Sequence, residues 1–261
     1  QDLEPVPYVR VTRQSTVFYS DQNGHLSLPY LPKDSIKIYA FSFSDTSIII
    51  PSEDSLTLLL KTKNTLLEEV SIYAKTISQH VIMLPKNHFF YAKKDYQREP
   101  GEVFLIEQSC TQCRLDSIVV NIREIMYENS GLRAVAYHGT EEIANGKVIT
   151  FEKGFTGNVT LPINQESAIL EDSIYWGIEF IRLNYKSRKN SNVASVFRTR
   201  GKKGLYTPRN NGVTLEGFKL RNKEYHTYLI CHLHGDKYIT KINAGLFGYA
   251  PLLQLYVSEL Q

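Results

Sequence analysis

Three cysteines and two histidines in two short motifs are the residues best suited to chemistry. CTQC contains Cys110 and Cys113, and CHLHGD contains Cys231, His232 and His234. Cysteine and histidine ligands form tetrahedral zinc sites. On a strand, however, Cys231 and His232 point to opposite faces and cannot share one ion. We therefore expect a local Cys110–Cys113 disulfide or free thiols, with a bridge from one of them to Cys231 and a metal site as alternatives.

A second candidate for ion binding is the segment DQNG, which spans Asp21 to Gly24. Its carboxylate and amide oxygens suit a hard cation, but an EF-hand-type loop places a glutamate about six residues after its glycine. This chain has Tyr30 there. Residues 25–28 alternate like a returning strand, and Asn23 and Gly24 tolerate the positive φ that tight turns require. The segment is therefore predicted to be a turn.

Motifs for enzymatic catalysis are missing from the sequence. It contains no Gly-x-Ser-x-Gly elbow, phosphate loop or dinucleotide-binding fingerprint. Paired carboxylates lie in turn-like contexts or in the closing strand of the N-terminal region, where a solvated surface explains them better than a glycosidase pair. These pairs are Glu68–Glu69, Glu141–Glu142 and Glu171–Asp172. We predict a protein that is not an enzyme and that has no catalytic residue, metal or cofactor.

Residues 182–209 carry nine positive charges and no acidic residue. Basic residues interleaved with aromatic ones can bind anionic glycans, lipid head groups or nucleic acid. A solvated connection between two strands has the same composition, and we favour that interpretation. Export would exclude nucleic acid as a partner. The candidate anion-binding residues are Arg188, Lys189, Arg198, Arg200, Lys202 and Lys203.

Tyr175 and Trp176, the latter the sole tryptophan, lie in an alternating apolar run. Neighbouring residues on a strand face opposite ways, so one ring belongs to the core while the other can form a sugar-stacking platform. We expect Trp176 to be the core residue.

Composition indicates a globular β-protein. Of 261 residues, 42% are hydrophobic and 22% charged, the net charge is +3, and 17 tyrosines and 12 phenylalanines accompany many β-branched residues. No apolar run approaches the roughly 18 residues of a membrane-spanning helix. The chain starts at Gln1 without a methionine, which suggests a removed signal segment and favours export.

The elements that must position these residues are short strands separated by turn residues. In the N-terminal region we predict strands at 6–11, 16–19, 25–28, 35–41, 46–50, 56–60 and 67–72. Later strands are predicted at 102–108, 115–123, 132–138, 147–150, 157–162, 175–183, 225–233 and 252–257. From His80 onward the sequence becomes polar and rich in turn residues, and this change places a domain boundary near residues 75–79. The prediction is two β-sandwiches, residues 1–76 and 77–261.

Four segments of the N-terminal region resemble a known module. PVPYVRV, TVFYSDQNGHLSL, DSIKIYAFSFSDTSIII and LTLLLKTKNTLLEEVSIYA are similar to the carboxypeptidase regulatory-like domain of Gram-negative bacterial envelope proteins, over about residues 4–75. The resemblance implies a small transthyretin-like sandwich whose turn residues serve architecture rather than catalysis.

The second unit resembles the galactose-binding-like jelly rolls that follow this module in such proteins. The segments that carry this likeness are LDSIVVNIRE, GLRAVAYHG, NVTLPI and SIYWGIEFI. The resemblance implies carbohydrate adhesion or a structural role. The two resemblances together imply a non-enzymatic exported binding or structural module of the envelope, in the periplasm or associated with the outer membrane. We expect its partners to be carbohydrate, an anionic envelope component or other envelope proteins. The alternative is a metal-assisted hydrolase or enzyme accessory domain that uses the Cys/His cluster.

Overall fold

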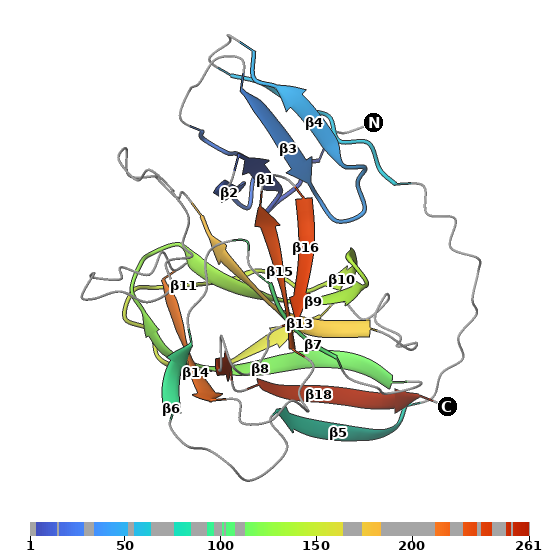
Figure 1. The fold of residues 1–261 in the computed structure, drawn as a ribbon, viewed down its shortest axis with the longest axis vertical. Helices are drawn as coiled ribbons and strands as arrows, with labels where there is room; N and C mark the ends of the chain where they lie inside the picture. The colour runs from blue at the N-terminus through green and yellow to red at the C-terminus, as the bar shows by residue number, and fades with distance from the viewer. Residues whose placement is uncertain are drawn as a thin grey trace.

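The computed structural model contains three antiparallel β-sheets and, within the residues it describes, no helix (Figure 1). The described residues are 4–14, 16–28, 34–51, 55–63, 76–84, 93–96, 101, 103–107, 113–163, 174–183, 212–219, 227–233, 236–241, 249–251 and 253–260. This architecture confirms the all-β prediction. None of the described residues forms a helix of the length and hydropathy needed to cross a membrane.

The N-terminal sheet has four strands in the order β2-β1-β3-β4. They are β1 (Arg10–Arg13), β2 (Thr16–Tyr19), β3 (Ser35–Tyr39) and β4 (Thr46–Ile49). Alternating apolar side chains on one face, among them Val11, Phe18 and Ile38, form a small core. In the register of the three neighbouring strands, Arg10 lies opposite both Tyr19 and Tyr39. These three side chains therefore share the other face of the sheet.

Two seven-stranded sheets make up the rest of the described chain. The first, the inner sheet, has the order β10-β9-β13-β7-β15-β16, with β11 also paired to β9. Its strands are β7 (Val103–Glu107), β9 (Ser130–His138), β10 (Glu141–Asn145), β11 (Ile149–Phe151), β13 (Ile174–Arg182), β15 (Thr227–Leu233) and β16 (Asp236–Lys241).

The second of these, the outer sheet, has the order β17-β14-β8-β18-β5, with β12 on β8 and β6 on β14. Its strands are β5 (Thr76–Leu84), β6 (Lys93–Tyr96), β8 (Cys113–Ile125), β12 (Gly157–Pro162), β14 (Val213–Lys219), β17 (Tyr249–Pro251) and β18 (Leu253–Leu260). The inner and outer sheets pack face to face around one large apolar core, as in a β-sandwich.

Strand β13 shows how the inner sheet has two buried faces. Trp176, Ile178 and Phe180 point into the sandwich core. Glu179 and Ile181 point to the opposite face, and they too are buried. A strand covered on both faces has no solvated side, so its sequence reads as a nearly continuous apolar run.

The N-terminal sheet packs on this opposite face of the inner sheet. Val17 and Tyr19 of β2 form a buried apolar cluster with Val148 and Ile181. Gly101, just before β7, lies at the same contact and donates its backbone N–H to the carbonyl of Phe180 at 2.8 Å. The contact surface between the N-terminal sheet and the inner sheet is therefore closely packed.

Replacing Gly101 with alanine is expected to lower the free energy of unfolding by about 1–3 kcal/mol. The new Cβ would lie 2.8–2.9 Å from the side chain of Val17, and Gly101 has a φ of 85° that favours glycine. Denaturant unfolding followed by the fluorescence of Trp176 measures the change. Gly154→Ala is the matched control, since Gly154 also has a φ of 85° but no atom within 4 Å of its added Cβ. Equal losses in both variants would contradict a role for the contact with Val17.

Several predicted strands differ from the observed elements. Residues 25–28 and 56–60 form no strand. Leu26, Leu28 and Leu60 are half-buried and pack against the small N-terminal core. Their spacing therefore reflects burial and not hydrogen bonding to a neighbouring strand. The predicted strand at 67–72 lies outside the described residues. The predicted boundary near residues 75–79 falls at the start of β5, and the division into two domains stays a prediction.

Candidate functional site

A buried charged cluster joins the N-terminal sheet to the inner sheet. The carboxylate of Glu179 is fully buried at its centre. Its Oε1 accepts hydrogen bonds from Nε of Arg10 at 3.0 Å, from Nη2 of the same arginine and from the hydroxyl of Tyr19 at 2.5 Å. Its Oε2 accepts one from Nε of Arg133 at 2.5 Å. Two guanidinium groups and a phenol thus share one carboxylate.

Strand register brings these residues together. Arg10 and Tyr19 lie opposite each other on β1 and β2, while Arg133 and Glu179 lie opposite each other on β9 and β13. Directly opposite residues of antiparallel strands present their side chains on the same face. When the two sheets pack, the pair from one sheet meets the pair from the other.

A second carboxylate extends the cluster toward solvent. Glu142 of β10 accepts hydrogen bonds from the hydroxyl of Tyr137 at 3.0 Å and from Nδ2 of Asn145 at 2.9 Å. It also lies 3.4 Å from Nη2 of Arg133 and 3.6 Å from Nη2 of Arg10. Every ionised group of the cluster therefore has a partner of opposite charge, as buried charges require.

The Glu141–Glu142 pair corrects one sequence-based interpretation. Both carboxylates were expected on a solvated surface. The side chain of Glu141 is 69% exposed, but that of Glu142 is only 12% exposed. Adjacent strand residues face opposite ways, and the inward one meets the arginines. The pairs at 68–69 and 171–172 lie outside the described residues.

Burial and charge act in opposite directions on Glu179. Burial alone would raise the pKa of this carboxyl group, because it disfavours the charged form. The positive charges of Arg10 and Arg133, with the hydrogen bonds from Tyr19 and Arg10, outweigh burial and lower the pKa to about 2. The pKa of the Tyr19 hydroxyl is raised by its burial and by the neighbouring carboxylate. Glu179 is therefore an anion between two cations at neutral pH, and Tyr19 is a neutral phenol.

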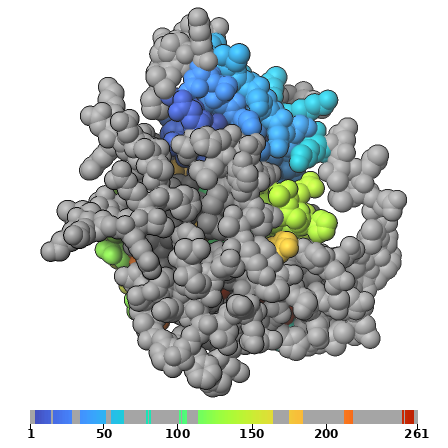
Figure 2. Space-filling view, viewed as in Figure 1, coloured from blue at the N-terminus to red at the C-terminus, as the bar shows by residue number. Residues whose placement is uncertain are grey.

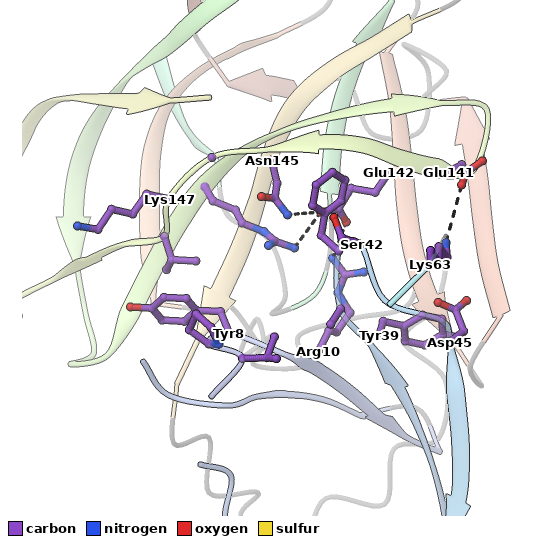
Figure 3. Close-up of a pocket in the computed structure, with 17 residues that line it drawn as sticks. Tyr8, Arg10, Tyr39, Ser42, Asp45, Lys63, Glu141, Glu142, Asn145 and Lys147 are labelled. Carbon is purple, nitrogen blue, oxygen red and sulfur yellow. Dashed lines mark hydrogen bonds and ion pairs between the residues drawn. The ribbon is translucent and has the colours of Figure 1, made fainter. Parts of the chain in front are cut away.

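A pocket of about 430 Å³ opens beside this cluster, between the N-terminal sheet and the β9–β10 part of the inner sheet (Figure 3). Figure 2 shows the blue N-terminal sheet adjoining the yellow-green surface of this part of the chain. The lining residues are Val6, Pro7, Tyr8, Arg10, Tyr39, Ala40, Phe41, Ser42, Asp45, Lys63, Arg133, Glu141, Glu142, Asn145, Gly146, Lys147 and Val148. Both sheets therefore contribute walls.

The lining combines aromatic rings with charges of both signs. Tyr8, Tyr39 and Phe41 supply the rings, and Lys63 pairs with Glu141 at 3.8 Å across the two walls. In Figure 3, Lys147 lies at one end of the pocket and Lys63 at the other. Such a site offers hydrogen-bond donors, acceptors and apolar ring faces to one ligand.

The DQNG segment forms the predicted turn. Oδ1 of Asp21 accepts hydrogen bonds from the backbone amides of Asn23 at 2.8 Å and His25 at 2.9 Å. The Gly24 amide donates to the carbonyl of Asp21, and Gly24 has a φ of 74°. The amide of His25, more than that of Asn23, lowers the pKa of the Asp21 carboxyl group. The carboxylate therefore serves the turn.

Trp176 and Tyr175 occupy different surroundings. Trp176 is 1% exposed and packs in the sandwich core, which is the core role expected for it. Its ring does not reach solvent and is closed to a bound sugar. Tyr175 is half-buried and packs beside Val135 and Tyr137 on the opposite face of the inner sheet. Neither aromatic residue lines the pocket.

The cysteine and histidine candidates fall on two different sheets where they are described. Cys113 begins β8 of the outer sheet, and Cys231 and His232 lie in β15 of the inner sheet. Cys110, His234 and the six basic candidates Arg188, Lys189, Arg198, Arg200, Lys202 and Lys203 lie outside the described residues. In the part of the chain that is described, no three His, Cys, Asp or Glu residues form a group able to hold a metal ion.

Sequence reasoning missed Arg10, Arg133, Glu179 and the pocket. The available signal was a charged residue inside an alternating apolar run, as in YVRV and YWGIEFI. A charge at such a position needs a buried partner, but the partner cannot be named from the run itself.

Comparison of the chain with family models, with curated proteins and with solved structures finds no match.

Proposed function

We propose that this protein is a non-enzymatic exported binding module of the bacterial envelope, and that it holds a carbohydrate in the pocket between the N-terminal and inner sheets. The observation that carries the proposal is the lining of this pocket. Sugar rings pack on aromatic faces, and their hydroxyl groups both donate and accept hydrogen bonds. Tyr8, Tyr39 and Phe41 supply such faces, and the charged residues around them supply donors and acceptors.

The charge balance of the pocket favours a ligand rich in hydroxyl groups and without strong net charge. The cations of the lining are Arg10, Lys63, Arg133 and Lys147, and the anions are Asp45, Glu141 and Glu142. Glu179 lies directly behind both arginines. Cations and anions nearly cancel, so a highly charged ligand would meet a repelling group as well as an attracting one.

The proposed location depends on the resemblance of residues 4–75 to envelope modules. The basic residues between 188 and 203 remain candidates for contact with an anionic envelope component or another envelope protein. Because these residues lie outside the described part of the chain, they contribute nothing to the choice of the pocket.

Replacing Phe41 with alanine is expected to weaken carbohydrate binding about tenfold, the effect of losing one stacked ring. Phe41 lines the pocket and is 37% exposed, so its removal leaves the fold nearly unchanged. A glycan array probed with the whole chain identifies bound glycans, and calorimetric titration of the retained glycans gives the dissociation constants.

The control for this experiment is Phe155→Ala. Phe155 is a phenylalanine of similar exposure, 39%, and it does not line the pocket. Its removal should leave binding unchanged. Carbohydrate binding that persists in the Phe41 variant and falls in the Phe155 variant would place the site elsewhere. An array with no retained glycan would refute carbohydrate as the ligand.

A further inference from the structure

We propose that Glu179 is a positioning residue for the pocket: it holds Arg10 and Arg133 in the orientation that presents their remaining N–H groups to the ligand. This inference rests on the proposed function, because it names how the same pocket is kept ready for binding. Glu179 does not itself line the pocket, whereas both arginines do.

The carboxylate of Glu179 bridges the two arginines. Oε1 of Glu179 receives Nε of Arg10, and Oε2 receives Nε of Arg133. The two arginines come from different sheets, β1 of the N-terminal sheet and β9 of the inner sheet. One side chain therefore sets the relative placement of a group on each pocket wall.

Not every N–H group of the two arginines is held by a carboxylate. A guanidinium group has N–H groups on Nε, Nη1 and Nη2. Glu179 accepts hydrogen bonds from Nε and Nη2 of Arg10 and from Nε of Arg133, while Nη2 of Arg133 forms an ion pair with Glu142 at 3.4 Å. Among the described residues, the Nη1 atoms of Arg10 and Arg133 have no hydrogen-bond partner. Neither of these two atoms is among the fully buried polar atoms that lack a partner. These two nitrogens are the donors left to face ligand hydroxyl groups.

No other described group holds both arginines as closely as Glu179 does. Glu142 lies 3.4 Å from Arg133 and 3.6 Å from Arg10, beyond good hydrogen-bond distance, whereas Glu179 approaches to 3.0 Å or less. Supporting side chains that fix a binding group in place set the precision of a site. Without the charge of Glu179, the two guanidinium groups would be free to reorient.

The test measures the reactivity of the two arginines with phenylglyoxal, located by peptide mass spectrometry. Glu179→Gln keeps the shape of the side chain and removes its charge. It is expected to raise the modification rate of Arg10 and Arg133 by about tenfold or more, because each loses a charge-assisted hydrogen bond. Tyr19→Phe is the matched control: it removes a hydrogen bond to the same carboxylate but leaves both arginine contacts. Its rates should equal those of the wild type.

Equal rates in Glu179→Gln and wild type, or an equal rise in Tyr19→Phe, would overturn the proposal. Equal rates in Glu179→Gln and wild type would mean that packing, and not the charge of Glu179, holds the arginines. An equal rise in Tyr19→Phe would mean that any disturbance of the cluster exposes the arginines. Circular dichroism verifies folding, and if Glu179→Gln is unfolded, Glu179→Asp replaces it. Aspartate keeps the charge with a shorter reach and should raise the rates by a smaller factor.

The glycan array then connects positioning to binding. Glycans retained by the wild type should be lost by Glu179→Gln and kept by Tyr19→Phe. Retention by Glu179→Gln would overturn the positioning role in binding. If the wild type retains no glycan, the proposed function fails, and the modification rates alone decide whether Glu179 holds the arginines.

Discussion

Replacing Glu179 with alanine is expected to lower the free energy of unfolding by about 3–5 kcal/mol, the usual cost of removing one partner from a buried ion pair. The carboxylate is fully buried, and Arg10 and Arg133 are nearly so. Without it, two guanidinium groups would stay buried with only the more distant Glu142 as a counter-charge. Denaturant unfolding followed by the fluorescence of Trp176 gives the free energy directly.

The pH dependence provides an independent check on the same residue. The folded-state pKa of Glu179 is about 2, below its ordinary value of 4.5. A depressed carboxyl pKa contributes stability that is fully present above the unfolded-state value and is lost as the pH falls through the folded-state value. The difference in stability between wild type and Glu179→Ala should therefore shrink from pH 4.5 toward pH 2.

Asp34→Ala is the control for the loss of stability expected in Glu179→Ala. Asp34 pairs with Arg13 at 2.9 Å, but both residues belong to the N-terminal sheet region and Asp34 is partly exposed. Arg13 also has further interactions, so it is not left alone when Asp34 is removed. We expect a loss of about 1 kcal/mol or less. An equal loss of unfolding free energy in Asp34→Ala and Glu179→Ala would mean that the buried ion pairs between the two sheets stabilise the protein no more than a partly exposed pair does.

Replacing Trp176 with alanine is expected to cost about 3–5 kcal/mol, as for large aromatic residues in a packed core. Trp176 is the largest fully buried side chain in the described residues. On β13 it lies between Ala136 of β9 and Ile106 of β7, both paired to it in register. Because alanine already occupies the neighbouring position on β9, no larger side chain there can fill the cavity.

Circular dichroism must follow the unfolding of this variant, since it lacks the only tryptophan. Tyr256→Ala is the control within the same sandwich: Tyr256 lies on β18 and is 39% exposed. Its truncation should change stability by no more than about 0.5 kcal/mol. A similarly small loss for Trp176→Ala would show that the core collapses around the missing ring.

Strands with regular alternation could be predicted closely from the sequence. The predicted bounds 16–19 and 157–162 match β2 and β12, and the other predicted strands that the structure contains differ by a few residues at their ends. The strands β5, β14 and β17 were not predicted. Alternation works because one face of each strand meets a core while the other does not. The turn at Asp21 was also predictable, since its side chain bonds to amides only two and four residues away.

Polar strands could not be predicted in this way. The strands β6, β10 and β16 have the sequences KKDY, EEIAN and DKYITK, which carry little apolar signal. They are strands because a neighbouring strand pairs with their backbone, and pairing depends on position in the sheet more than on composition. Glu142 lies on such a strand, which is why its burial was missed.

The sequence by itself determined that the chain is all-β and that Trp176 faces a core, because both follow from local spacing. Only the tertiary structure decided that the second face of β13 is also covered, and by which residues. Arg10 and Glu179 are 169 positions apart, and nothing local to either specifies the other. An alternating run shows that two faces differ, but what lies against each face depends on how separate sheets pack. The charged cluster and the pocket arise at that contact.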